Sequence, residues 1–111
     1  MRVEAFAGPS GTGKTTTICG LIRQAVANGE RAGAIKHTHH PLNDEDRGDT
    51  ALFRAAGADP VILASDGEAV VFSASGTERI RFSDPRELLD QFDADVVFVE
   101  GFKSYDWGNA G

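Results

Sequence analysis

Cysteine, methionine, tryptophan and tyrosine each occur only once in this chain of 111 residues, and long hydrophobic runs are missing. A single cysteine, Cys19, excludes an internal disulfide, so we expect a reducing compartment. Cys19 falls on the apolar face of an expected helix, where packing is commoner than thiol chemistry. No apolar stretch approaches the roughly 20 residues of a membrane-spanning helix, and the first residues lack a signal-peptide pattern. These absences predict a cytoplasmic protein that does not enter a membrane.

Positive charge is also scarce, with 11 lysines and arginines against 17 acidic residues and a net charge of −6. A protein that coats DNA or RNA needs clustered cations, so we expect no nucleic-acid partner. Nucleotide binding remains open, because it needs only local donors and one or two cations. The hydrophobic share of 41% and the length suit one globular domain over residues 1–111 with a modest core.

The first third of the chain has the pattern of a strand, a helix and a second strand. A short apolar segment at 3–7 ends in a glycine-rich turn, and 31–36 reads as the second strand. Between them, Asn28 and Gly29 stop a helix whose apolar residues recur at helical spacing: Ile18, Leu21, Ile22, Ala25 and Val26. This order is the unit of a parallel sheet.

The rest of the chain predicts more strands and two further helices. A short helix is expected over 50–56, with Asp49 as its N-cap and Gly57 as its stop. Strands at 60–64 and 69–73 flank a hairpin turn, and Ile80 and Phe82 suggest another edge strand. A helix is expected from Pro85, with Leu88, Leu89 and Phe92 facing inward, and the apolar run at 95–99 predicts a central strand buried on both faces.

Residues 8–15 read GPSGTGKT, a full match to the phosphate-binding pattern G-x-x-x-x-G-K-[ST] between a strand and a helix. Glycines let the backbone turn around phosphates, and successive N–H groups with the helix N-terminus attract the anion. Lys14 brings a charge to the β and γ phosphates, and Thr15 offers a hydroxyl to Mg²⁺. The motif predicts a nucleoside triphosphate site with contacts from Ser10, Gly11, Thr12, Gly13, Lys14, Thr15 and Thr16.

Glu100 directly follows the apolar run at 95–99. The carboxyl edge of a parallel sheet is where ligands bind, and P-loop proteins place a carboxylate there for the Mg²⁺ shell. We therefore predict Thr15 and Glu100 as the metal ligands, although a solvated strand end is the simpler alternative. Lys103 follows closely and is either a phosphate contact or an exposed loop lysine.

All three histidines of the chain lie in a polar segment over 37–48 that has no periodicity and reads as an exposed loop. The spacing of these histidines fits no standard zinc pattern, and no cysteine lies among them. A contact to substrate or to the γ-phosphate is another interpretation, because the second strand of such a sheet ends beside the phosphate loop. A plain polar loop explains the composition as well. The candidates for substrate or switch contacts are Lys36, His37, His40, Asp49 and Arg54.

Four blocks in this order, GPSGTGKTT, GAIKHTHH, RGDTALFRAAGA and DADVVFVEGFK, resemble the molybdopterin-guanine dinucleotide biosynthesis protein B (MobB) family. They run from near residue 7 to residue 103, so the resemblance covers nearly the whole chain. The phosphate loop alone is shared by many families, whereas the KHTHH, GDT…AGA and VEGFK blocks are far more selective.

The resemblance implies a GTP-binding protein with at most weak GTPase activity. The resemblance further implies that it assists the enzyme that joins GMP to molybdopterin and that it forms a homodimer. Family members usually continue past the VEGFK block with at least one more strand, so we expect this chain to be either a shortened member or one whose remaining residues are missing from this sequence. No N/T-K-x-D motif for guanine occurs, so the preference for guanine follows from the resemblance alone.

Together these observations predict an α/β, three-layer, P-loop NTPase-like fold, with a mainly parallel sheet and a β-hairpin excursion. The leading functional hypothesis is a GTP-binding accessory protein of molybdenum-cofactor biosynthesis that uses Mg²⁺ and switches the segment over 37–49 between order and disorder. Hydrolysis should be slow at most, because no water-positioning glutamine or arginine finger is evident. The alternatives are a small-molecule kinase, although no arginine-rich lid is present, and a non-catalytic module gated by nucleotide.

Overall fold

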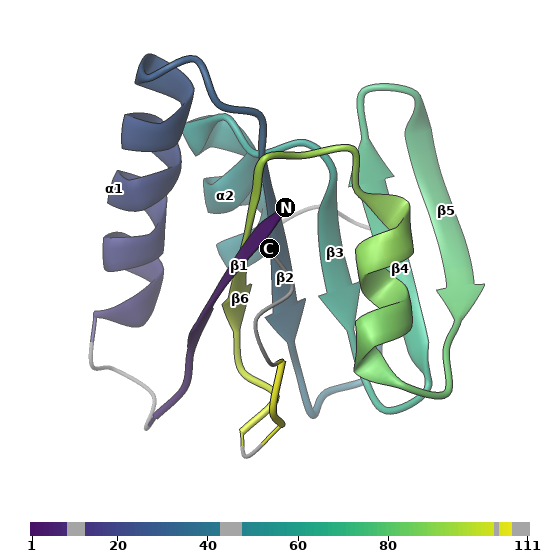
Figure 1. Ribbon diagram of the computed structural model, residues 1–111. Coiled ribbons are helices and arrows are strands. Elements are labelled where there is room, and N and C mark those ends of the chain that lie inside the picture. Colours follow the sequence, from purple (N-terminus) through teal and green to yellow (C-terminus); the bar gives the residue numbers. More distant parts are fainter. Residues whose placement is uncertain (9–12, 43–47, 104, 108–111) are drawn as a thin grey trace.

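The computed structural model describes residues 1–8, 13–42, 48–103 and 105–107 (Figure 1). Within these ranges six strands form one sheet in the order β1-β6-β2-β3-β4-β5. The elements in chain order are β1 (Arg2–Phe6), α1 (Lys14–Ala27), β2 (Ala32–His37), α2 (Asp49–Ala56), β3 (Val61–Ala64), β4 (Glu68–Ser73), β5 (Gly76–Arg81), the 3-10 helix η1 (Pro85–Gln91) and β6 (Val96–Glu100).

The sheet is the middle of three layers. Helices α1 and α2 cover one face, and η1 covers the other (Figure 1). Each face has its own core: Ile18, Ile22 and Phe53 pack on the α1–α2 side, whereas Ile35 and Leu88 belong to the core on the η1 side. The predicted three-layer α/β architecture is therefore confirmed. None of the described helices has the length and apolar character needed to cross a bilayer.

The sheet combines a parallel part with an antiparallel hairpin. Strands β1, β6, β2 and β3 run parallel, while β4 returns antiparallel to β3 and β5 antiparallel to β4. All five residues of β6 are buried, as its β-branched and aromatic run predicts for a strand covered on both faces. The predicted mainly parallel sheet with a β-hairpin excursion is confirmed.

The register of β6 brings three strand ends together. Glu100 is paired with Phe6 of β1 on one side and with Lys36 of β2 on the other. Because parallel strands end at the same edge, the residues that follow β1, β2 and β6 surround one point. The sequence leaves this lateral order open, and the fold decides it.

Several local predictions need correction. Asp49 is the first residue of α2 rather than its N-cap, which is Gly48, because the Asp49 carboxylate accepts a hydrogen bond from Lys36. Val26, predicted on the apolar face of α1, is 44% exposed, because the buried face of this helix follows Ile18, Ile22 and Ala25. His37 belongs to β2 and not to the loop.

The remaining elements agree with the sequence in type more than in detail. The helix predicted from Pro85 is a 3-10 helix, and Asp84 and Glu87 form a capping box at its start. Phe92 caps its other end, and a Cβ on Gly33 would lie 2.3 Å from the Phe92 ring. Gly33 therefore lets η1 close onto the sheet. The predicted last edge strand is β5, which ends before Phe82.

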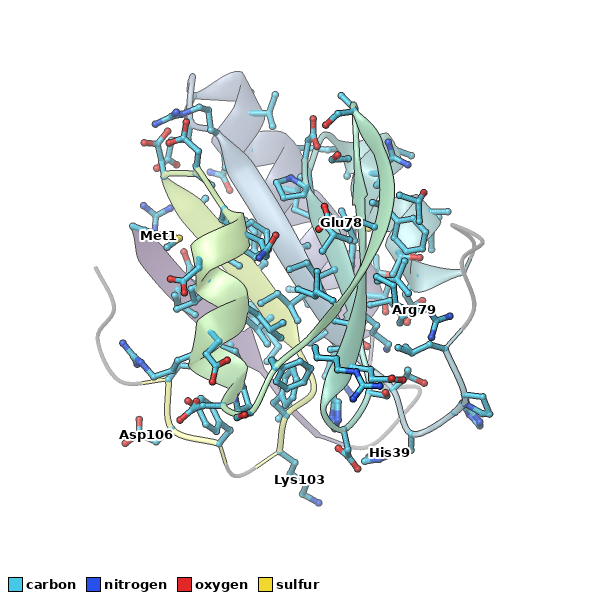
Figure 2. The ribbon with its side chains drawn as sticks, turned by 90° about the vertical axis from the view of Figure 1, so that its right-hand side faces the viewer. Met1, His39, Glu78, Arg79, Lys103 and Asp106 are labelled. Carbon is cyan, nitrogen blue, oxygen red and sulfur yellow. The ribbon has the colours of Figure 1, made fainter. Side chains whose placement is uncertain are left out.

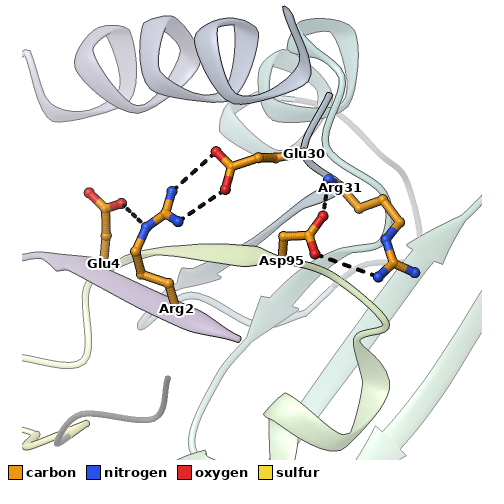
Figure 3. A network of polar contacts seen from close by, with 5 residues as sticks. All are labelled: Arg2, Glu4, Glu30, Arg31 and Asp95. Atoms are coloured by element: carbon orange, nitrogen blue, oxygen red, sulfur yellow. Dashed lines mark hydrogen bonds and ion pairs between the residues drawn. The ribbon is translucent and has the colours of Figure 1, made fainter. Parts of the chain in front are cut away.

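The amino ends of β1, β2 and β6 carry a network of charges (Figure 3). The Arg2 guanidinium donates hydrogen bonds to Glu4 and Glu30. The Arg31 backbone N–H donates to Asp95 Oδ2 at 2.8 Å, and the Arg31 guanidinium lies 3.6 Å from Oδ1. This network lies at the edge of the sheet opposite the carboxyl ends of these strands.

Candidate nucleotide-binding site

A cavity of about 500 Å³ opens at the carboxyl ends of β1, β2 and β6. Figure 2 shows His39 and Lys103, two of its lining residues, at this end of the molecule and Met1 far from it. One part of the lining is the strand-to-helix turn, with Ala7, Gly8, Gly13, Lys14, Thr15 and Thr16. The other part comes from the ends of β2 and β6 and the start of α2, with Lys36, His37, His39, Asp49, Glu100, Gly101, Phe102 and Lys103.

Two glycines, Gly8 and Gly13, lie at the described ends of the turn between β1 and α1. Gly8 and Gly13 both have positive φ, 148° and 82°, so glycine suits both positions. Gly13 has no side chain to cap α1, and first-turn N–H groups without a cap can donate hydrogen bonds to an anion. The predicted contacts Ser10, Gly11 and Thr12 lie outside the described residues.

Lys14 lies at the mouth of this turn. Its ammonium group donates a hydrogen bond to the backbone carbonyl of Gly8, with Nζ and O 2.8 Å apart. The positive charge is thus held across the turn that the motif assigns to phosphate. A triphosphate is a stronger partner for an ammonium group than a neutral carbonyl.

Thr15 and Glu100 are 85 residues apart in sequence and in direct contact in the fold. The Thr15 hydroxyl donates to Glu100 Oε1, with 2.7 Å between the oxygens. Glu100 is only 5% exposed, because it is the last residue of the buried strand β6. The two residues predicted to hold Mg²⁺ therefore come together, one from α1 and one from β6.

Lys36 lies beside this pair. Its ammonium contacts the second oxygen of Glu100, Oε2, and also Asp49 Oδ2 at 2.7 Å. The pKa of Lys36 is raised: burial acts to lower it, but the hydrogen bonds to Asp49 and Glu100 outweigh that effect. Lys36 is therefore a fully charged cation between two carboxylates.

His37 connects three segments around the cavity. Its ring stacks on Phe102, with centroids 4.1 Å apart and an interplanar angle of 12°. Nδ1 accepts the Phe102 backbone N–H at 3.3 Å, and Nε2 lies 3.2 Å from Asp66 Oδ1. The nitrogen that accepts carries no proton, so the hydrogen is on Nε2 and points to Asp66. His37 thereby joins the ends of β2 and β6 to the turn before β4.

Two of the predicted contact residues are not brought to the cavity. His40 is exposed, and its backbone N–H donates to Thr38 Oγ1. The Arg54 guanidinium is directed to the carbonyl of Ser73 at 3.4 Å, and Arg54 does not line the cavity. Arg54 lies in the sixth position of α2, past the turn that reaches the site.

The lining also includes residues that the sequence interpretation did not select. His39 and Phe102 were not candidates, and Phe102 gave no sequence signal beyond its place after Glu100. Lys103 had been noted as either a phosphate contact or a loop lysine, and it lines the cavity. Within the described ranges, no three histidine, cysteine or acidic side chains are arranged as a metal cluster.

A parallel sheet with a glycine turn between β1 and α1, and a buried acid at the end of the neighbouring strand, defines the P-loop NTPase-like class of α/β proteins. Comparison with protein families places the chain within this class. The sequence model of the MobB family, "Molybdopterin guanine dinucleotide synthesis protein B", matches residues 3–108. The chain therefore belongs to the MobB family.

Individual relatives agree with this assignment. The chain is 40% identical over 101 residues to the molybdopterin-guanine dinucleotide biosynthesis adapter protein of Escherichia coli (strain K12), covering 89% of this chain and 58% of the relative. The adapter protein of Haemophilus influenzae (strain ATCC 51907 / DSM 11121 / KW20 / Rd) is 38% identical over 100 residues, covering 86% and 54%. The chain thus spans little more than half the length of these relatives.

A solved structure supports the fold. The crystal structure of Bacillus subtilis MobB matches with a TM-score of 0.61 at 24% identity, covering 95% of this chain and 63% of that one. At this identity the match concerns the arrangement of strands and helices.

Proposed function

We propose that this domain binds GTP with Mg²⁺ and serves as a nucleotide-binding adapter in the synthesis of molybdopterin guanine dinucleotide. The observation that carries the proposal is the contact of Thr15 with Glu100 inside a cavity that also contains Lys14. A hydroxyl, a carboxylate and a lysine at the N-terminus of a helix are the groups that a metal-bound triphosphate requires. The adapter role is supported by the names of the relatives.

The donor set suits Mg²⁺. Thr15 and Glu100 offer hard oxygen atoms, and Mg²⁺ is commonly bound through one or two such protein ligands together with substrate phosphates and water. Glu100 is nearly buried at the end of β6, and its two carboxylate oxygens face Thr15 and Lys36 at the cavity. When bound, Mg²⁺ neutralises negative charge on the phosphate oxygens. In the proposal Thr15 and Glu100 hold the ion and Lys14 holds the phosphates.

The cavity supports binding more than rapid hydrolysis. Its described lining contains no glutamine and no arginine, which are the residues that orient water and stabilise charge in fast GTPases. We therefore propose a GTPase that is slow at most. In this role the nucleotide sets the affinity for the synthesis enzyme, and the protein acts as a homodimer.

Titration calorimetry with GTP and with ATP, each with and without Mg²⁺, tests the nucleotide part of the proposal. We expect saturable GTP binding that Mg²⁺ strengthens and that exceeds ATP binding. Absence of GTP binding in Mg²⁺ would reject the proposal, and equal binding of ATP would reject the guanine preference.

A pull-down with a molybdopterin guanine dinucleotide synthesis enzyme, with and without GTP, tests the adapter part. An unchanged amount of captured enzyme would count against it.

A further inference from the structure

The ammonium group of Lys36 lies beside Glu100, where the proposed function places the metal ion. It contacts Glu100 Oε2 and Asp49 Oδ2, while Glu100 Oε1 accepts the Thr15 hydroxyl. Both oxygens of the proposed metal-binding carboxylate are therefore already engaged by groups of the chain itself. The Lys36 side chain is 23% exposed and that of Glu100 only 6%, so the pair is largely withdrawn from water.

The regular elements of the fold fix the backbone positions of Lys36, Glu100 and Asp49. Lys36 and Glu100 are register partners on adjacent parallel strands, and Asp49 begins α2 at the same edge. An uncompensated carboxylate in such a place is strongly destabilising, so a resident cation stabilises it. Lys36 supplies this cation without a ligand.

We propose that Lys36 is a built-in counter-cation that stands in for the divalent metal between Asp49 and Glu100, and so makes the site select Mg²⁺ bound to a triphosphate over free Mg²⁺. This inference rests on the function proposed above. A free metal ion meets a carboxylate that is already neutralised and a neighbouring positive charge that repels it. A triphosphate changes this balance, because its oxygens offer Lys36 a new partner and Glu100 is then released for the metal.

The same geometry makes Lys36 a specificity-determining residue. Its loss should weaken discrimination against free metal, whereas the loss of a phosphate-binding lysine such as Lys14 should weaken nucleotide binding itself. A purely structural role for Lys36 predicts a less stable protein whose affinity for free Mg²⁺ is unchanged. The two roles therefore differ in a measurable quantity.

The test compares the binding of free Mg²⁺ to wild type and to Lys36→Met by titration calorimetry and by the rise in Tm with Mg²⁺ alone. We expect Lys36→Met to bind free Mg²⁺ at least about tenfold more tightly, because a unit charge a few ångströms from the ion is removed. Arg23→Met is the matched control. It removes the same charge from the exposed surface of α1, about 12 Å along the helix from Thr15, and should leave the affinity for free Mg²⁺ unchanged.

Equal affinities of wild type and Lys36→Met for free Mg²⁺ would overturn the inference. Lys36→Gln, a polar replacement, is the second variant if Lys36→Met does not fold. A measurement on the wild type needs no variant: the chain has three lysines, Lys14, Lys36 and Lys103, so the ammonium signal of Lys36 can be assigned by NMR. It should shift with Mg·GTP and stay unchanged with Mg²⁺ alone, and a shift with Mg²⁺ alone would contradict the inference.

The outcome is separable from that of the proposed function. If the wild type does not bind Mg·GTP, the proposed function fails. If it binds Mg·GTP and Lys36→Met gains no affinity for free Mg²⁺, only the role of Lys36 fails.

Discussion

Gly101 lies so close to His37 that a Cβ at position 101 would come within 2.7 Å of the His37 Cβ. Gly101 also has a φ of 102°, which L side chains rarely adopt. The chain therefore leaves β6 directly after Glu100 and passes over His37, which brings Phe102 onto the imidazole ring. His37, Gly101 and Phe102 all line the cavity, and their close packing can be tested by substitution.

Gly101→Ala should destabilise the protein by about 1 to 3 kcal/mol, the usual cost of a strained backbone position, and the steric clash adds to it. Urea denaturation measures the change in the free energy of unfolding. Gly20→Ala is the matched control, because Gly20 lies on the exposed side of α1 and a Cβ there meets nothing within 4 Å. It should stabilise the protein by about 0.5 to 1 kcal/mol. Similar effects of the two substitutions would argue against the described path of residues 100–102.

Lys14→Ala should remove binding of GTP while the protein stays folded. The lysine donates a hydrogen bond to a backbone carbonyl, and it lies at a cavity and not in a core. Its substitution should change the free energy of unfolding by no more than about 0.5 kcal/mol, as is usual for residues away from the core. Calorimetry with Mg·GTP and urea denaturation of the same sample make the two measurements. Unaltered GTP affinity, or loss of cooperative unfolding, would contradict the assignment of Lys14.

Thr15→Val should abolish the effect of Mg²⁺ on GTP binding. The variant keeps the shape of the side chain but removes the hydroxyl that contacts Glu100 Oε1. We expect the affinity for GTP in Mg²⁺ to fall at least about tenfold, a loss typical of disturbed metal sites. Thr17→Val makes the same change on an exposed residue of α1 and should retain the Mg²⁺ effect. A Thr15→Val protein that still responds to Mg²⁺ as the wild type does would exclude Thr15 as a ligand.

Asp95 predicts a specific pH dependence of stability. The Arg31 backbone N–H holds the pKa of this carboxyl below its ordinary value, the loss of hydration opposes this, and the Arg31 guanidinium adds to the lowering (Figure 3). A carboxyl whose pKa is lowered in the folded state stabilises that state above its ordinary pKa. The contribution is lost as the pH falls through the folded-state pKa. The wild type should therefore lose stability below about pH 4.

Asp95→Asn should lose less stability than the wild type between pH 7 and pH 3, as measured by urea denaturation at both values. Asp93→Asn is the control, since Asp93 also pairs with Arg31 but its side chain is 94% exposed. It should follow the wild type more closely. An Asp95→Asn protein with the full acid dependence would show that the Arg31–Asp95 contact does not stabilise the folded state.

The order and type of the elements could be predicted because they depend on local patterns. The helical spacing of Ile18 and Ile22 predicted a helix, and both residues are buried in α1. The apolar run at 95–99 predicted a buried strand, and all residues of β6 are buried. Local signals were less reliable where a distant residue competes for a side chain. Aspartate is a residue favoured as an N-cap, but the Asp49 carboxylate contacts Lys36 instead. The sheet brings this lysine to the start of α2.

The sequence alone determined the phosphate-loop motif, the alternation of strands with helices and the family resemblance, since each depends on residues close together along the chain. Only the tertiary structure decided that β6 lies between β1 and β2. That strand order joins Thr15 to Glu100 and inserts Lys36 between Glu100 and Asp49. The physical reason is that a contact between residues far apart in the chain, such as Lys36 and Glu100, depends on the register of parallel strands. No local pattern specifies that register.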